Sequence, residues 1–264
     1  MGPFGWFTRW RRRRVLARQP LPADEWRRVA RGIPCLWGLA ARDSARLREM
    51  VALFLDRKAL TGVQGLALTR SMRLQIAAQA CLPILNLDLD YYDGWHEVVV
   101  YPGSFRVRHP VHDEIGVVSE RDEVLSGEAW ERGPVILSWS DIRYELDHRC
   151  AGSNVIIHEF AHKLDMLNGG ANGMPPLHAD MQPQAWTEAL SAAYDAVQRQ
   201  LDYHRADAID PYGATSPGEF FAVLSEYFFT DPQRLLHEFP DVYRQLRQFY
   251  RQDPVSRLVR SGVA

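Results

Sequence analysis

The segment "NVIIHEFAHKLDMLNG", from Asn154 to Gly169, decides how the rest of the chain is interpreted. Its apolar residues recur at helical spacing, Ser153 or Asn154 can cap its start, and glycine follows its end, which predicts a largely buried helix of about four turns. His158 and His162 are four residues apart in this helix and therefore share one face. Two imidazoles at this spacing can bind one zinc ion.

Glu159 directly follows the first of these histidines. In H-E-x-x-H metallopeptidases, the glutamate at this position takes a proton from the zinc-bound water. The alternative is a core helix that carries polar residues for unrelated reasons. Burying three ionisable groups without a partner is costly, and a bound metal removes that cost. The pattern therefore favours a zinc site, with Glu159 as its base.

A catalytic zinc needs a third protein ligand and one open position. A second apolar helix is predicted in "SPGEFFAVLSEYFFTD", residues 216–231, and it contains Glu219 and Glu226 on one face. Glu219 could instead form a capping box with Ser216, so the residues alone slightly favour Glu226 as the ligand. Three histidines in polar surroundings are weaker alternatives: His178, His204 and His237.

Asp165 lies three residues after the second histidine of the pair. It could accept the far N–H of an imidazole and fix the tautomer of that ring. It could equally be a carboxylate on the surface of the helix. Asp165 and Asn168 also occupy the positions where metzincins have glycine and histidine, which excludes that class.

Composition and charge limit the classes of function. The chain has 264 residues, is 46% hydrophobic and 24% charged, and has a net charge of -2. That balance argues against direct nucleic-acid binding, which requires a basic excess. The three cysteines are scattered, with no C-x-x-C pair, as expected in a reducing compartment. Lysine occurs only at Lys58 and Lys163.

The N-terminal segment is basic, with four consecutive arginines at residues 11–14. No apolar run of signal-peptide length follows it, and no stretch is long enough for a membrane span. We therefore expect a cytoplasmic protein with a flexible tail over residues 1–22 and one domain over residues 23–264.

Patterns elsewhere in the chain predict an α+β protein with one core, in which helices enclose a small sheet. We expect a helix from Asp43 to Lys58, capped by Asp43 or Ser44, and another that ends before Pro83. Short β-branched runs predict strands at residues 96–102, 114–120 and 133–141. The segment "LSGEAW", residues 125–130, is predicted to be a turn.

Several long segments resemble the Mlc titration factor A family: "NVIIHEFAHKLDMLNG", "SPGEFFAVLSEYFF", "FYRQDPVSRL" and "GPVILSWSDI". The resemblance extends from about Pro34 to Leu258 and is weak between Gly170 and Tyr212. It implies a zincin-like metallopeptidase fold with a small mixed sheet, similar to the catalytic domain of anthrax lethal factor. It also implies a bacterial cytosolic zinc peptidase of gluzincin type, with aminopeptidase activity, that binds the glucose-responsive repressor Mlc.

The resemblance further assigns roles to individual residues. It implies that Glu219 is the third zinc ligand and that Glu226 is a buried carboxylate supporting the ligands. Tyr212, seven residues before Glu219, would donate to the oxyanion of the intermediate. The peptide substrate is expected to pair with an edge strand, for which Val135–Trp139 is the predicted segment. The alternative is a regulatory protein that sequesters a transcription factor without catalysis.

Overall fold

The computed structural model describes residues 14–18, 20–103, 105–112, 118–125, 127–129, 133–202 and 209–261, with the backbone alone described between 105 and 129. Its helices are α2 (Ala23–Arg31), α3 (Ala41–Arg57), α4 (Arg70–Cys81), α5 (Trp139–His148), α6 (Val155–Asp165), α7 (Pro183–Asp202), α8 (Pro217–Thr230), α9 (Pro232–Glu238), α10 (Pro240–Tyr250) and α11 (Pro254–Ser261). Short 3₁₀ helices are η1 (Pro34–Leu36), η2 (Leu89–Tyr92), η3 (Met166–Asn168) and η4 (Pro211–Thr215). Its strands are β1 (Ala59–Gly62), β2 (Glu97–Tyr101), β3 (Phe105–His112), β4 (Val118–Leu125), β5 (Gly127–Ala129) and β6 (Val135–Ser138).

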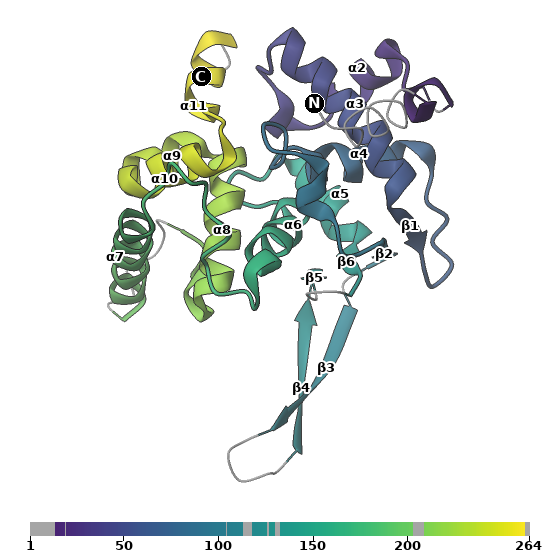
Figure 1. Cartoon of the computed structure of the whole chain (residues 1–264). Coiled ribbons are helices and arrows are strands. Elements are labelled where there is room, and N and C mark those ends of the chain that lie inside the picture. The colour runs from purple at the N-terminus through teal and green to yellow at the C-terminus, as the bar shows by residue number, and fades with distance from the viewer. Residues whose placement is uncertain are drawn as a thin grey trace.

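The main sheet has four strands in the order β1-β2-β6-β5. β1, β2 and β6 are parallel, whereas β5 runs antiparallel to β6, with Ala129 opposite Val135. β3 and β4 form a separate antiparallel ribbon (Figure 1). The predicted α+β class and the mixed character of the sheet are therefore confirmed, and β5 is an edge strand.

The strand predictions are only partly correct. β2 lies where it was predicted, and β6 is shorter, because Ser138 caps α5 by accepting a hydrogen bond from the backbone N–H of Asp141 at 3.4 Å. The predicted turn at 125–130 is wrong, since residues 127–129 form β5. Pairing with β6 outweighs the low strand propensity of its residues. β4 begins at Val118, and residues 114–117 of the predicted strand lie outside the described residues.

The early helices are confirmed, but one of their caps is not. α3 begins at Ala41, after Ala40, which provides no side-chain cap. Ser44 instead accepts a hydrogen bond from the indole N–H of Trp26 at 2.8 Å, which fastens α2 to α3. α4 is capped by Thr69 and ends at Cys81, before the proline that was expected to stop it.

The core surrounds α6, all of whose residues are buried. On the sheet side, Phe160 packs against a group of rings at centroid distances of 5.1 to 5.8 Å, from Tyr92, Trp95 and Phe54. On the opposite side, α6 packs against α8, which is also buried over most of its length (Figure 1). A helix covered on both sides is held firmly enough to position chemical groups.

The N-terminal region begins before the first complete helix. Residues 14–18 are helical and Val15 is buried in the core, while residues 1–13 of the predicted tail lie outside the described residues. The division at residue 22 stays a prediction. In the part of the chain that the structure describes, no helix is both long and apolar enough to cross a membrane. Cys35, Cys81 and Cys150 are all free thiols.

Candidate metal centre

The two histidines of α6 and the first glutamate of α8 converge on one point. The Nε2 atom of His158 lies 2.9 Å from Oε2 of Glu219 and 3.2 Å from Nε2 of His162. The Nε2 atom of His162 lies 3.3 Å from the same carboxylate oxygen. Within the described residues, these three form the one group of histidine, cysteine or acidic side chains close enough to hold a metal ion.

The spacing of these three atoms fits a tetrahedral metal. Ligand atoms about 2.0 Å from a tetrahedral zinc lie about 3.3 Å from one another. The three observed separations, 2.9, 3.2 and 3.3 Å, are close to this value. Two imidazole nitrogens with one carboxylate oxygen are also a donor set that zinc accepts in catalytic sites. The residues present therefore fit a bound metal ion.

Local capping fixes the direction of both helices. Asn154 caps α6 by accepting a hydrogen bond from the backbone N–H of Ile157 at 2.9 Å. Ser216 caps α8 by accepting one from the backbone N–H of Glu219 at 3.2 Å. The side chain of Glu219 lies against the two imidazoles. Of the capping box considered from sequence, the bond to Ser216 is therefore present, while the carboxylate of Glu219 is turned toward the histidines. This carboxylate is therefore available to a metal ion.

Glu226 lies behind the cluster. Its Oε1 accepts a hydrogen bond from Nδ1 of His158 at 2.7 Å, and its Oε2 accepts one from the backbone N–H of Asn154. The residues alone had slightly favoured Glu226 as the third ligand, and the geometry corrects this, because the carboxylate faces the nitrogen that points away from the cluster. Such a contact fixes the tautomer and orientation of an imidazole.

The charges in the cluster depend on one another. Burial alone lowers the pKa of His158, but hydrogen bonds with Glu219 and Glu226 outweigh burial and hold that pKa well above its usual value. Burial also raises the pKa of Glu219, yet the two imidazoles lower it far below the ordinary range. For His162, burial prevails and the pKa is lowered. Without a metal, the site therefore holds an ionised Glu219, a neutral His162 and a protonated His158, and a metal ion has to displace the proton of His158 in order to bind.

Asp165 does not have the contact considered for it. Its Oδ2 accepts a hydrogen bond from the backbone N–H of Gly173 at 2.7 Å. Among the described residues, Nδ1 of His162 has no hydrogen-bond partner. Asp165 is also fully buried, which excludes a surface role, and burial raises its pKa to about 6. Its function is to hold the loop that follows α6.

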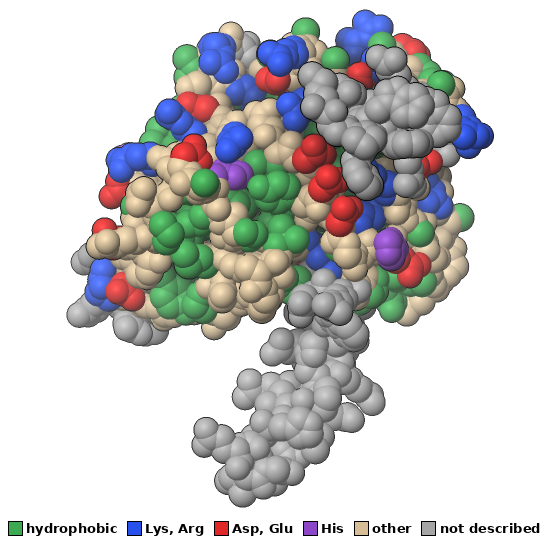
Figure 2. Space-filling view, viewed as in Figure 1, with side chains coloured by type: hydrophobic (Ala, Val, Ile, Leu, Met, Phe, Trp, Pro, Cys, Tyr) green, Lys and Arg blue, Asp and Glu red, His purple; other side chains and the backbone are tan. Residues whose placement is uncertain are grey.

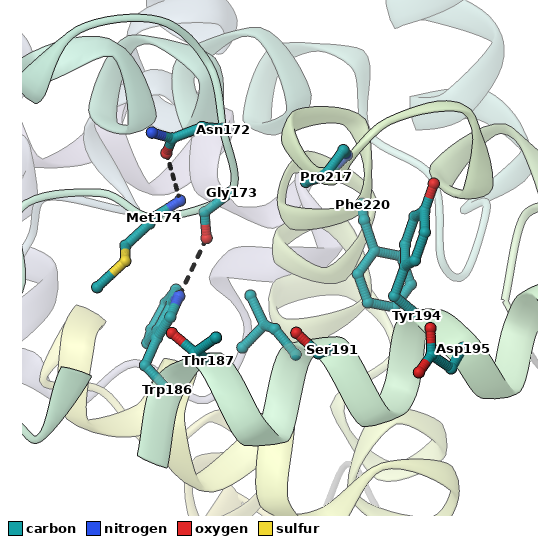
Figure 3. Close-up of a pocket in the computed structure, with 11 residues that line it drawn as sticks. Asn172, Gly173, Met174, Trp186, Thr187, Ser191, Tyr194, Asp195, Pro217 and Phe220 are labelled. Carbon is teal, nitrogen blue, oxygen red and sulfur yellow. Dashed lines mark hydrogen bonds between the residues drawn. The ribbon is translucent and has the colours of Figure 1, made fainter. Parts of the chain in front are cut away.

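That loop packs against the start of α8. The carbonyl of Gly173 accepts a hydrogen bond from the indole N–H of Trp186 in α7 at 3.0 Å (Figure 3). Between the loop, α7 and the first turn of α8 lies a cavity of about 210 Å³, lined mainly by apolar side chains such as Met174 and Phe220. The loop thus contacts both the end of α6, through Asp165, and the start of α8, at Pro217.

The remaining predicted residues have definite places. Glu159 is buried in α6, and Tyr212, in η4, is 44% exposed with its ring centroid 5.9 Å from that of His158. Of the weaker alternatives for the third ligand, His178 contacts the backbone carbonyl of Phe249, His237 is exposed on α9, and His204 lies outside the described residues.

A family comparison agrees with this arrangement. The family model described as glucose-regulated metallo-peptidase M90 matches residues 7–251. The chain belongs to the M90 family. Curated relatives named Mlc titration factor A include one from Salmonella paratyphi B, 42% identical over 94% of this chain and 92% of its own length. Others come from Yersinia enterocolitica (43% identical, 89% of this chain and 88% of the relative) and Klebsiella pneumoniae (41%, 89% and 88%).

Two residues of this M90 chain were missed from sequence. Glu145, near the end of α5, accepts hydrogen bonds from the hydroxyl of Ser153 at 2.8 Å and the backbone N–H of Val155 at 3.0 Å. Lys163 is buried in α6 beside the second histidine. The pattern "SDIRYELDH" gives no sign that its glutamate turns inward, and a lysine in an apolar helix was the one available signal for the other.

Proposed function

We propose that the chain is a zinc-dependent peptidase of gluzincin type with a zincin-like fold, in which His158, His162 and Glu219 hold one zinc ion. The observation that carries the proposal is the near-tetrahedral spacing of the three ligand atoms, on a helix where a glutamate directly follows the first histidine. Membership of a metallopeptidase family supports it.

The side chains around the ligands suit hydrolysis of a peptide bond. A zinc ion bound there would supply Lewis acidity toward the substrate carbonyl and lower the pKa of a bound water. Glu159 takes the proton of the attacking water and returns it to the leaving amine. Tyr212, exposed at the edge of the cluster, donates its phenol O–H to the developing oxyanion. Glu226 keeps the imidazole of His158 in position through Nδ1.

The substrate strand differs from the one predicted. Residues 135–137 of β6 are paired on one side with β2 and on the other with β5, and Trp139 belongs to α5, so the predicted segment 135–139 is not an edge strand. β5 is at the edge of the sheet and contacts α6. We therefore propose that an extended peptide pairs with β5 by backbone hydrogen bonds and thereby passes over the metal centre on α6.

Glu159→Gln tests this function, because the amide cannot accept the proton although it has nearly the same shape. Purified wild type should contain about one zinc per chain and hydrolyse aminoacyl reporters, with free N-termini preferred over blocked ones. The variant should keep the zinc and lose at least about a hundredfold in kcat. Equal turnover by both proteins, or no zinc in the wild type, would refute the proposal.

A second function, binding of a repressor, is favoured by one observation: the relatives carry the name Mlc titration factor A. We propose that this chain can bind a similar transcriptional repressor, and three free thiols are consistent with a cytoplasmic location. Such binding would be independent of the base, so Glu159→Gln should retain the repressor in a pull-down. If the wild-type protein binds the repressor but hydrolyses none of the reporters, the regulatory function is the correct one.

A further inference from the structure

The two lysines of the chain lie on the same tryptophan. Lys58 and Lys163 are 6% and 3% exposed. Their ammonium nitrogens lie 3.8 Å and 5.3 Å from the ring centroid of Trp95. A buried ammonium group needs hydrogen-bond acceptors to offset the loss of water, so the acceptors show what each lysine holds.

The acceptors of the two lysines lie in different parts of the fold. Lys58 directly precedes β1 and donates to the backbone carbonyls of Tyr92 and Trp95, in the segment that leads into β2, at the opposite end of the sheet from β5. Lys163 donates to the backbone carbonyl of Gly133 at 2.9 Å. Gly133 lies two residues before Val135, where β6 pairs with the end of β5. One lysine therefore stabilises a turn near β2, and the other joins α6 to the segment that leads into the edge of the sheet.

The position of Lys163 in α6 gives this contact a consequence for the site. The residue follows His162 directly and lies one turn after Glu159. A rigid helix fixes the position of Lys163 relative to these two residues. The hydrogen bond from Lys163 to Gly133 then fixes the position of the β5–β6 pair relative to the helix. An extended peptide on β5 must place its scissile carbonyl at the metal to within a fraction of an ångström.

We infer that Lys163 is a positioning residue for the substrate: its ammonium group fastens the β5–β6 edge to the metal-binding helix, so that a peptide paired with β5 lies in register with the metal. This inference rests on the proposed function. It extends that function by naming the residue that connects peptide recognition to the metal centre.

The test compares Lys163→Met with Lys58→Met, since each variant removes one buried ammonium group from the same ring. Binding of a tripeptide hydroxamate and of acetohydroxamate would be measured on the zinc-loaded proteins by calorimetry. Both ligands need the metal and neither requires turnover, but only the longer one can pair with β5. Amide hydrogen exchange over residues 133–138 and the free energy of unfolding would be recorded for each variant.

We expect Lys163→Met to lower the affinity for the tripeptide hydroxamate about tenfold, which corresponds to the loss of one hydrogen bond from a charged group. The affinity for acetohydroxamate should change by less than about twofold. Exchange over residues 133–138 should become faster in this variant and stay unchanged in Lys58→Met. The inference would be overturned if Lys163→Met lowered the affinity for both hydroxamates equally. It would also be overturned if the two variants, at equal stability, changed ligand affinity and hydrogen exchange to the same extent. Loss of turnover alone would not, so failure of the proposed function remains distinguishable.

Discussion

At the start of α6, two carboxylates from different helices accept hydrogen bonds from consecutive backbone N–H groups. Glu226 of α8 bonds to the N–H of Asn154, and Glu145 of α5 bonds to that of Val155. Each thereby satisfies a backbone N–H at the start of the helix that has no acceptor within the helix. Glu226 also bonds to the imidazole of His158, and Glu145 does not. Their substitution should therefore have different effects on the metal.

Glu226→Gln should lower zinc affinity about tenfold, because the ligand histidine loses the charged acceptor at Nδ1. Glu145→Gln is the matched control and should leave zinc affinity unchanged. Competition with a chromophoric chelator measures both values. Equal affinity in the two variants would contradict a role for Glu226 in supporting the ligand.

Glu145 should make stability depend on pH. Burial raises its pKa from 4.5 to about 7. Between these pH values the folded protein binds more protons than the unfolded chain, so the free energy of unfolding falls as pH rises. Glu145→Gln should remove this dependence, so its free energy of unfolding should rise by about 3 kcal/mol relative to that of the wild type across this interval. Urea titrations at several pH values measure the difference, and a constant difference would contradict it.

At this scale, sequence predicts the ligands better than their support. The spacing of His158 and His162 fixes a shared face, because helix geometry is regular. The choice between Glu219 and Glu226 cannot be made that way, since residues seven apart share a face and differ only in their position along the helix axis, so the answer depends on how far α8 is shifted along α6. The role of Glu145 could not be predicted, because its partners, the hydroxyl of Ser153 and the backbone N–H of Val155, come close to it only through the packing of α5 against the start of α6.

At the scale of elements, the loop after α6 adds a second connection between α6 and the start of α8, beside the direct packing of the two helices. Gly173 has φ +77°, and a Cβ there would lie 2.6 Å from the carbonyl oxygen of Pro217. Gly173→Ala should destabilise the protein by about 2 to 4 kcal/mol through backbone strain and this clash, and should weaken zinc binding because the turn before Glu219 moves.

Gly170→Ala is the control for that change, since a Cβ at Gly170 would meet nothing within 4 Å. Chemical denaturation of both variants, each with and without zinc, makes the comparison. If the two alanine variants are equally stable, the loop does not hold α8 in the way described.

The elements that sequence missed share a physical cause. β5 has three residues and takes its conformation from pairing with β6. No local sequence pattern reveals such pairing. The predicted caps of α3 failed because tertiary contact with Trp26 takes the hydroxyl of Ser44. α6 and α8 were predicted well, since their caps and apolar runs are local properties of the sequence.

At the scale of the whole molecule, most of the core does not depend on a metal. The aromatic group around Phe160 and the apolar face of α8 pack without the three ligands. Charged residues of both signs are mixed over the face shown in Figure 2, and hydrophobic side chains gather where α8 lies in Figure 1. Folding should therefore survive loss of the ion, unlike that of zinc-finger domains.

Removal of zinc with a chelator should lower the melting temperature and leave the chain folded at 25 °C. Free zinc at a thousandfold excess over its Kd would add about 4 kcal/mol of stability. A Glu219→Gln variant should show a much smaller shift, since one ligand is lost. Circular dichroism with and without chelator measures this, and unfolding at 25 °C or an unchanged wild type would contradict it.

The burial of both lysines also bears on how the folded chain can be modified. Acetylation, carbamylation and attachment of a protein tag through an isopeptide bond all require a reachable ε-amine. Lys58 and Lys163 are the only lysines in 264 residues, and both are closed to such reagents in the folded state. A reagent that attacks the lysine side chain would therefore report unfolding, and a label attached through either lysine would mark chains that had opened.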